Sequence, residues 1–126
     1  MRGFAQMVGR AMEDSNEEVR ARALENLREF PAEVQLAGLQ AALKSPDKAM
    51  RTEALDLICI ETNKDTVMLA MSALKDGDNA IHEKAQEVLE RLVDQKFESY
   101  EAAVTWWNAN SRRYNYEMLE RQDPDE

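Results

Sequence analysis

The chain has 126 residues and a formal net charge of −9, with 33% charged and 44% hydrophobic residues. This length suffices for one domain with its own core, and the charge excess disfavours non-specific binding to nucleic acid or an anionic membrane. A single cysteine, Cys59, excludes an internal disulfide framework and a cysteine-rich zinc site. With no apolar N-terminal run, we expect a cytoplasmic protein. Only four glycines and three prolines favour an all-α fold.

Three stretches of the sequence repeat one pattern at an interval of 31 residues. They read DSNEEVRARALENL from Asp14, SPDKAMRTEALDLI from Ser45 and DGDNAIHEKAQEVL from Asp76. No insertion separates them, and the segments before each stretch follow the same interval. The matching apolar columns are Val19, Met50 and Ile81; Ala23, Ala54 and Ala85; and Leu27, Ile58 and Leu89.

Each repeat is predicted to contain two helices. In the first repeat, Val19, Ala23, Leu27 and Phe30 follow steps of three and four residues, which places them on one helical face. The segment VQLAGLQAAL has similar helical spacing. Turn and capping residues separate the helices at FPAE, KSPD, ETNKD and KDGDN. The predicted helix pairs therefore cover about residues 1–30, 31–61 and 62–93 of a single domain, 1–126.

The pattern resembles the short form of the HEAT repeat, in which a capping residue precedes an aliphatic–arginine pair and two further apolar positions. The third repeat departs from it, with His82 in the arginine column and Gln86 in a leucine column. The resemblance implies a right-handed α-solenoid of three helix pairs, with the arginine column bridging neighbouring repeats. The residues that carry it are Asp14, Val19, Arg20, Ala23 and Leu24, then Ser45, Asp47, Met50, Arg51, Ala54 and Leu55.

The period fails after the third repeat, where the chain reads TWWNANSRRYNY over residues 105–116. The preceding ESYEAAVTWWNAN still has helical spacing. A terminal solenoid unit must cover the apolar face of the last repeat, so we expect an aromatic capping helix within residues 97–120. The alternative is an aromatic–arginine surface that grips a partner, since these residue types are enriched at interaction hot spots. That surface would contain Trp106, Arg112, Arg113 and Tyr114.

No specific catalytic, cofactor or metal motif is present in the sequence. The only histidine, His82, cannot form a multi-histidine metal site, and no basic residue near Cys59 is evident to activate its thiol. Glycine-rich phosphate loops, nucleophile elbows and zinc spacings are absent. The sequence therefore favours a non-enzymatic protein with no catalytic, cofactor-binding or metal-binding residues.

An acidic column predicts where a partner would bind. Glu25, Asp56 and Glu87 recur at 31-residue steps on the second helices, which line the concave surface in HEAT solenoids. An acidic row favours a basic protein or peptide, so a protein-interaction or scaffold module is the predicted function. Two alternatives stay open. Short HEAT-like repeats also occur in bilin lyases, which handle chromophores, and the chain could be a structural fragment of a longer solenoid.

Overall fold

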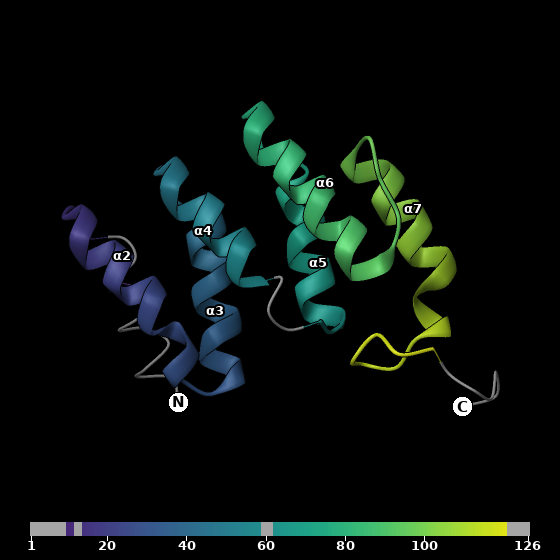
Figure 1. Cartoon of the computed structure of the whole chain (residues 1–126), viewed down its shortest axis with the longest axis horizontal. Coiled ribbons are helices and arrows are strands. Elements are labelled where there is room, and N and C mark those ends of the chain that lie inside the picture. Colours follow the sequence, from purple (N-terminus) through teal and green to yellow (C-terminus); the bar gives the residue numbers. More distant parts are fainter. Residues whose placement is uncertain (1–9, 12–13, 59–61, 121–126) are drawn as a thin grey trace. The chain divides into compact units, whose positions relative to one another are not determined.

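The computed structural model describes residues 10–11, 14–58 and 62–120. Within these ranges the protein is all-helical, with six α-helices, two short 3-10 helices and no β-strand (Figure 1). The predicted all-α class is therefore confirmed. No described helix is long and apolar enough to cross a membrane. The chain forms two compact units, Met1–Leu57 and Ile58–Glu126, and each is described below by itself.

The first unit contains α2 (Glu17–Glu25), the 3-10 helix η1 (Asn26–Glu29), α3 (Ala32–Leu43) and all of α4 (Lys48–Ile58) except its last residue. The side chain of Asn16 accepts the amide hydrogen of Glu18 at 2.8 Å and so caps α2. Pro31 comes directly before α3, and Asp47 accepts the amide of Ala49 at 3.0 Å as α4 begins. These breaks fall at the predicted FPAE and KSPD segments.

The core of the first unit joins the apolar faces of these helices. A close approach of η1 to α3 depends on Gly38, because a Cβ atom there would lie 2.5 Å from Cδ1 of the buried Leu27. Val19 is 38% exposed, although Met50 in the same column is buried. The buried apolar residues are Leu24, Leu27, Val34, Leu39, Ala42, Met50, Ala54 and Leu55.

The second unit contains α5 (Lys64–Ala73), α6 (Asn79–Val93), α7 (Tyr100–Asn110) and the 3-10 helix η2 (Ser111–Arg113). Helix α5 packs against both α6 and α7. Asn63 and Thr66 form a reciprocal capping box at the start of α5, and both are buried. Asp78 caps α6 by accepting the amide hydrogen of Ala80 at 2.8 Å. The predicted break at KDGDN is therefore confirmed.

The residues after η2 return to the start of α5. The carbonyl oxygen of Tyr116 accepts the amide hydrogen of Lys64 at 2.7 Å, which satisfies one of the unpaired donors of the first helical turn. The Tyr116 hydroxyl donates to the Asp65 carboxylate at 2.6 Å. Met118 is buried, with a left-handed φ of 66°. Residues 114–120 thus form an ordered segment rather than a continuation of the predicted capping helix.

Candidate functional site

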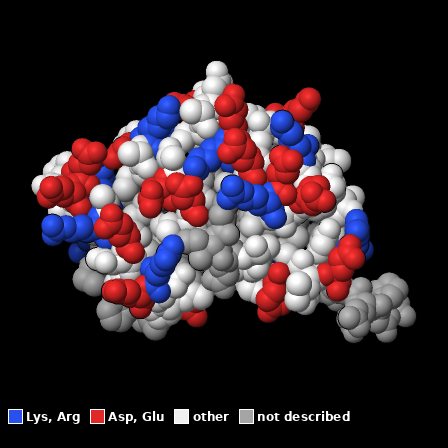
Figure 2. Space-filling model, in the orientation of Figure 1, with Lys and Arg blue, Asp and Glu red and all other residues white. Residues whose placement is uncertain are grey.

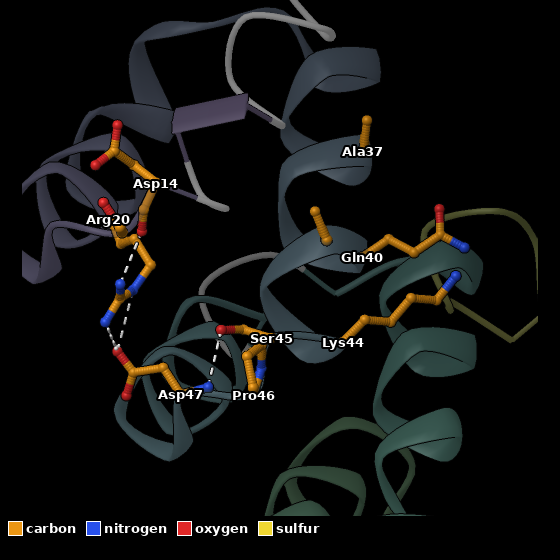
Figure 3. A pocket seen from close by; sticks show the side chains of 10 residues that line it. Asp14, Arg20, Ala37, Gln40, Lys44, Ser45, Pro46 and Asp47 are labelled. Carbon is orange, nitrogen blue, oxygen red and sulfur yellow. Dashed lines mark hydrogen bonds and ion pairs between the residues drawn. The ribbon is translucent and has the colours of Figure 1, made fainter.

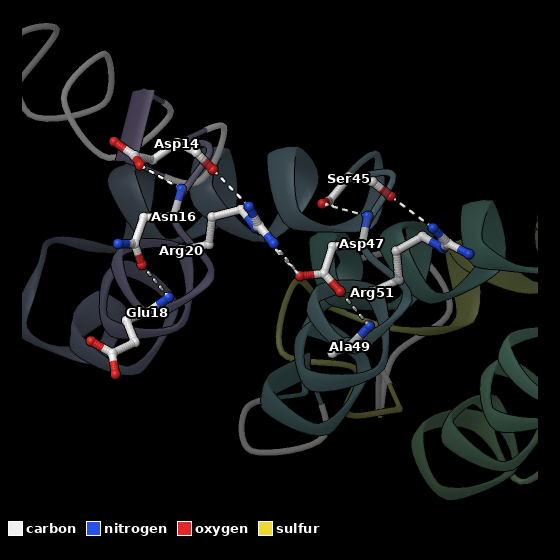
Figure 4. A network of polar contacts seen from close by, with 8 residues as sticks. All are labelled: Asp14, Asn16, Glu18, Arg20, Ser45, Asp47, Ala49 and Arg51. Atoms are coloured by element: carbon white, nitrogen blue, oxygen red, sulfur yellow. Dashed lines mark hydrogen bonds and ion pairs between the residues drawn. The ribbon is translucent and has the colours of Figure 1, made fainter.

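A polar network joins the start of α2 to the start of α4 within the first unit (Figure 4). The Arg20 guanidinium donates through Nη2 and Nε to Oδ2 of Asp47, at 2.9 and 3.3 Å, and through Nη1 to the carbonyl of Asp14 at 2.8 Å. Arg51 repeats the last contact, donating through Nη1 to the carbonyl oxygen of Ser45 at 2.8 Å. Arg20, in the first of the sequence stretches that match at 31-residue steps, thus contacts Asp47 in the second.

The network holds the Asp47 carboxylate in its ionised form. The hydrogen bond from the Arg20 side chain is the largest effect and lowers the pKa of Asp47 below its usual value; the amide of Ala49 and the charge of Arg20 act in the same direction. Burial opposes them and raises the pKa. Because Arg20 and Asp47 compensate each other's charge, neither is a strong attractor for an outside ion.

A large hollow of about 900 Å³ lies beside this network. In Figure 3, Arg20 and Asp47 lie on one side, whereas Gln40 and Lys44 extend from α3 in the other direction. Small-molecule sites place a few polar groups so that they converge on the ligand. The polar side chains here do not converge, and the Arg20 guanidinium already donates to Asp47 and to the carbonyl oxygen of Asp14. The hollow therefore lacks the donor arrangement of a ligand site.

A smaller hollow of about 190 Å³ lies between α2 and α4, and we name it the α2–α4 groove. Its apolar lining includes the buried side chains of Leu24 and Met50, which are 1% and 4% exposed. Two exposed alanines, Ala21 and Ala49, extend that apolar floor. The described residues that line it are Glu17, Ala21, Leu24, Glu25, Asp47, Ala49, Met50 and Glu53.

The rim of the α2–α4 groove is acidic. Within the described ranges, the exposed carboxylates of Glu17, Glu25 and Glu53 take part in no hydrogen bond or ion pair. The fourth carboxylate, Asp47, is the one that Arg20 holds. The lining includes no lysine or arginine among the described residues. The groove therefore combines an apolar floor with three uncompensated negative charges.

The three residues of the predicted acidic column are all exposed, on three different helices. Glu25 is the last residue of α2 and lines the α2–α4 groove. Asp56 lies on α4 but does not line that groove, and Glu87 lies on α6 in the second unit. Acidic and basic side chains are interspersed on the face drawn in Figure 2. On α6, helical spacing places Lys84 and Arg91 beside Glu87.

The aromatic candidates at the C-terminal edge form a packed cluster. Trp106 is half-buried, and its ring lies 5.6 Å from that of Phe97, 6.5 Å from Trp107 and 6.4 Å from Tyr114, between ring centroids. Such separations and the tilted rings are typical of stabilising aromatic pairs. The structure thus brings Trp106 and Tyr114 together, with Trp106 at the centre of the cluster.

The two arginines of this edge are exposed. Arg113 lies over the ring of Tyr114 at 5.6 Å and pairs with Glu120 at 2.9 Å. Arg112 is also exposed, on η2 beside it. Arg113 is thus held by contacts within the second unit.

Both ring nitrogens of His82 lie near backbone carbonyl oxygens. Its Nδ1 lies 3.0 Å from the carbonyl oxygen of Leu74 and its Nε2 lies 3.1 Å from that of Glu98. The ring therefore links the end of α5 to the segment before α7, and Nε2 of Gln86 donates to the carbonyl oxygen of Phe97 in that segment at 2.6 Å. No group of three or more potential metal ligands is assembled in the ranges that the structure describes. Cys59 lies outside them.

Sequence reasoning found Glu25 but missed Glu17, Glu53 and the apolar floor of the groove. Each repeat column contains residues at the same position of successive repeats. The groove is instead lined by residues at different positions of the first and second repeats. A usable signal was present: Ala21 and Glu25 are one helical turn apart on α2, as are Ala49 and Glu53 on α4. Each helix thus presents a small residue followed, one turn later, by a carboxylate.

Comparison of the chain with protein-family models, curated proteins and solved structures gave no match. The resemblance to HEAT repeats therefore depends on the sequence columns alone.

Proposed function

We propose that the protein is a non-catalytic interaction module that binds a basic segment of another protein in the α2–α4 groove. The observation that carries this proposal is the groove itself, where three carboxylates without partners surround an apolar floor. Charge complementarity of this kind guides association and selects partners of opposite sign. The net charge of −9 adds long-range attraction for a basic partner.

The position of Glu25 supports a role outside the fold. A negative side chain in the last turn of a helix opposes the helix dipole, by roughly 0.3–1 kcal/mol. Glu25 is the last residue of α2, and no ion pair within the described chain offsets this cost. Glu17 differs, because it lies in the first turn, where the dipole favours an acidic residue. Among the rim residues, Glu25 is therefore the one whose negative charge is least accounted for by the stability of its helix.

The contact energies are consistent with a modest interaction. An exposed ion pair contributes about 0.2–1 kcal/mol, and each buried methylene group contributes roughly 0.8 kcal/mol. A groove of about 190 Å³ offers room for only a few such contacts. We therefore expect affinities between the millimolar and the high-micromolar range for a short segment, and tighter binding where a partner also contacts a second surface.

Selection from a random peptide library displayed on phage would test this function, with the full chain as bait and a bait-free surface as background. We expect enrichment of peptides rich in lysine and arginine. Those peptides should lose binding to a Glu25→Lys, Glu53→Lys variant. A Glu29→Lys, Glu33→Lys variant is the control, because it changes the net charge equally at two exposed residues that do not line the groove. Failure to enrich any peptide over background would refute the proposal.

A further inference from the structure

The shape of the α2–α4 groove restricts what can enter it. Pockets that enclose drug-sized ligands measure about 300–1,000 Å³, whereas this groove measures about 190 Å³. Its floor is apolar over Leu24 and Met50, and the negative groups stand at the rim rather than at the bottom. A single side chain with an aliphatic stem and a cationic end matches this arrangement better than a compact ion does.

We infer that the α2–α4 groove is a specific receptor for one lysine side chain of a partner protein. The lysine stem lies on the apolar floor, and its ammonium group lies at the rim by Glu25 of α2 and Glu53 of α4, while Glu17, two helical turns from Glu25, adds longer-range attraction. This inference depends on the proposed protein-binding function and names the chemical group that is recognised.

Lysine fits these rim groups better than arginine does. An ammonium group is a compact charge with three donors in freely rotating directions, which suits carboxylates contributed by different helices. Arginine recognition instead favours one carboxylate that accepts two parallel bonds in a plane. The Arg20–Asp47 contact within this protein already uses the guanidinium–carboxylate pairing, and it leaves Asp47 compensated at the edge of the groove.

The aliphatic stem is as important as the charge. Lysine side chains bury their methylene groups along apolar surfaces while the charged end stays in water. The exposed alanines Ala21 and Ala49 leave that floor open, since neither has a side chain long enough to cover it. A shorter basic side chain would reach either the floor or the rim, but not both.

The test is a nuclear magnetic resonance titration of the ¹⁵N-labelled full chain with a capped nine-residue alanine-based peptide that carries one central lysine. We expect saturable shifts of the amide signals of Ala21, Ala49 and Met50. Three matched peptides replace the lysine by acetyl-lysine, by arginine or by diaminopropionic acid, which has a short stem. Each should bind at least about tenfold more weakly, or about 1.4 kcal/mol.

Protein variants test the rim of the groove. Neutralisation in a Glu25→Gln, Glu53→Gln variant should weaken lysine-peptide binding at least about tenfold, while a Glu29→Gln, Glu33→Gln variant binds within about twofold of the unchanged chain. Unchanged dispersion of the amide spectrum shows that each variant is folded. Loss of binding in both variants would instead indicate a general charge effect and overturn the inference.

The remaining outcomes separate the inference from the proposed function. Absence of shifts at the groove, or equal binding of the acetyl-lysine peptide, would overturn the lysine receptor. If peptides selected by display still bound in the groove through arginine or through several basic residues, the proposed function would stand without the lysine receptor. Spermidine is a further probe, because a free polyamine has the same cationic and methylene groups. If spermidine bound as tightly as the lysine peptide, the assignment of a protein side chain as the occupant of the groove would be overturned.

Discussion

Arg20 on α2 and Asp47 at the start of α4 are 27 residues apart in sequence, and Nη2 of Arg20 lies 2.9 Å from Oδ2 of Asp47. Their side chains are 18% and 20% exposed, so water screens the pair only in part. The contact joins the two helices that form the walls of the α2–α4 groove. The polar network therefore stabilises the first unit and also holds together the two helices that line the α2–α4 groove.

A double-mutant cycle measures the strength of this contact. We expect Arg20→Met and Asp47→Asn each to lower the free energy of unfolding, with a coupling between them of about 1 kcal/mol. The free energies would come from urea denaturation followed by circular dichroism. The Arg113–Glu120 pair is a matched control with the same 2.9 Å separation but side chains 56% and 67% exposed. Its coupling should be smaller, and equal couplings would contradict the role of partial burial.

The same carboxylate predicts a pH dependence. Arg20 lowers the pKa of Asp47 in the folded protein below the value of about 3.9 expected in the unfolded chain. The stabilisation is therefore present above pH 4 and is lost as the pH falls through the folded-state pKa. The difference in unfolding free energy between the unchanged protein and Asp47→Asn should be largest near pH 7. Denaturation curves at pH 7, 5, 4 and 3 would measure it, and a difference that grows toward pH 3 would contradict the assignment.

Gly38 gives a prediction about packing. A methyl group there meets Cδ1 of Leu27 at 2.5 Å, and Leu27 is fully buried and has little room to move. Overpacking costs about 1–3 kcal/mol, which outweighs the gain of roughly 1 kcal/mol in helix propensity. We expect Gly38→Ala to lower the melting temperature. Gly77→Ala is the control, since no atom lies within 4 Å of its added Cβ; it should leave the melting temperature unchanged or raise it.

The capping box of α5 predicts unequal costs for two asparagines. Asn63 is 7% exposed and accepts the amide of Thr66 at 2.9 Å, whereas Asn16 caps α2 from an exposed position. Replacing a cap by alanine costs about 0.5–2 kcal/mol, and the loss is greater where a buried group is left without a partner. We expect Asn63→Ala near the upper value and Asn16→Ala near the lower one in urea denaturation. The reverse order would show that burial does not decide the cost.

The sequence predicted the helices well because their signals are local. The turn residues around Pro31 and Pro46, and the capping Asp78, stop or start helices through their own backbone and hydrogen-bonding preferences. The buried columns, such as Met50, Ala54 and Ile58, also follow directly from helical spacing. Helical spacing places Val19 in the same column as Met50, yet Val19 is exposed, because the burial of a side chain depends on contacts that spacing does not specify.

The groove and the C-terminal segment depend on contacts between distant residues. No local signal links Tyr116 to Lys64 or Asp65, so the return of residues 114–120 to α5 could not be predicted from helical spacing. Likewise, Glu25 and Glu53 line one groove only because α2 and α4 pack at a particular distance. The acidic column identified Glu25 through the repeat, whereas its partners across the groove required the structure.

In the aromatic cluster around Trp106, packing and partner binding lead to different expected results. Trp106 contacts three aromatic rings, so Trp106→Ala should lower the free energy of unfolding by about 2 kcal/mol, below the 3–5 kcal/mol of fully buried sites because this side chain is half-buried. Arg112→Ala, at an exposed position nearby, should change it by less than about 0.5 kcal/mol. Urea denaturation followed by circular dichroism would compare them. If Trp106→Ala left stability unchanged while weakening peptide binding, the cluster would act as a partner surface rather than as packing.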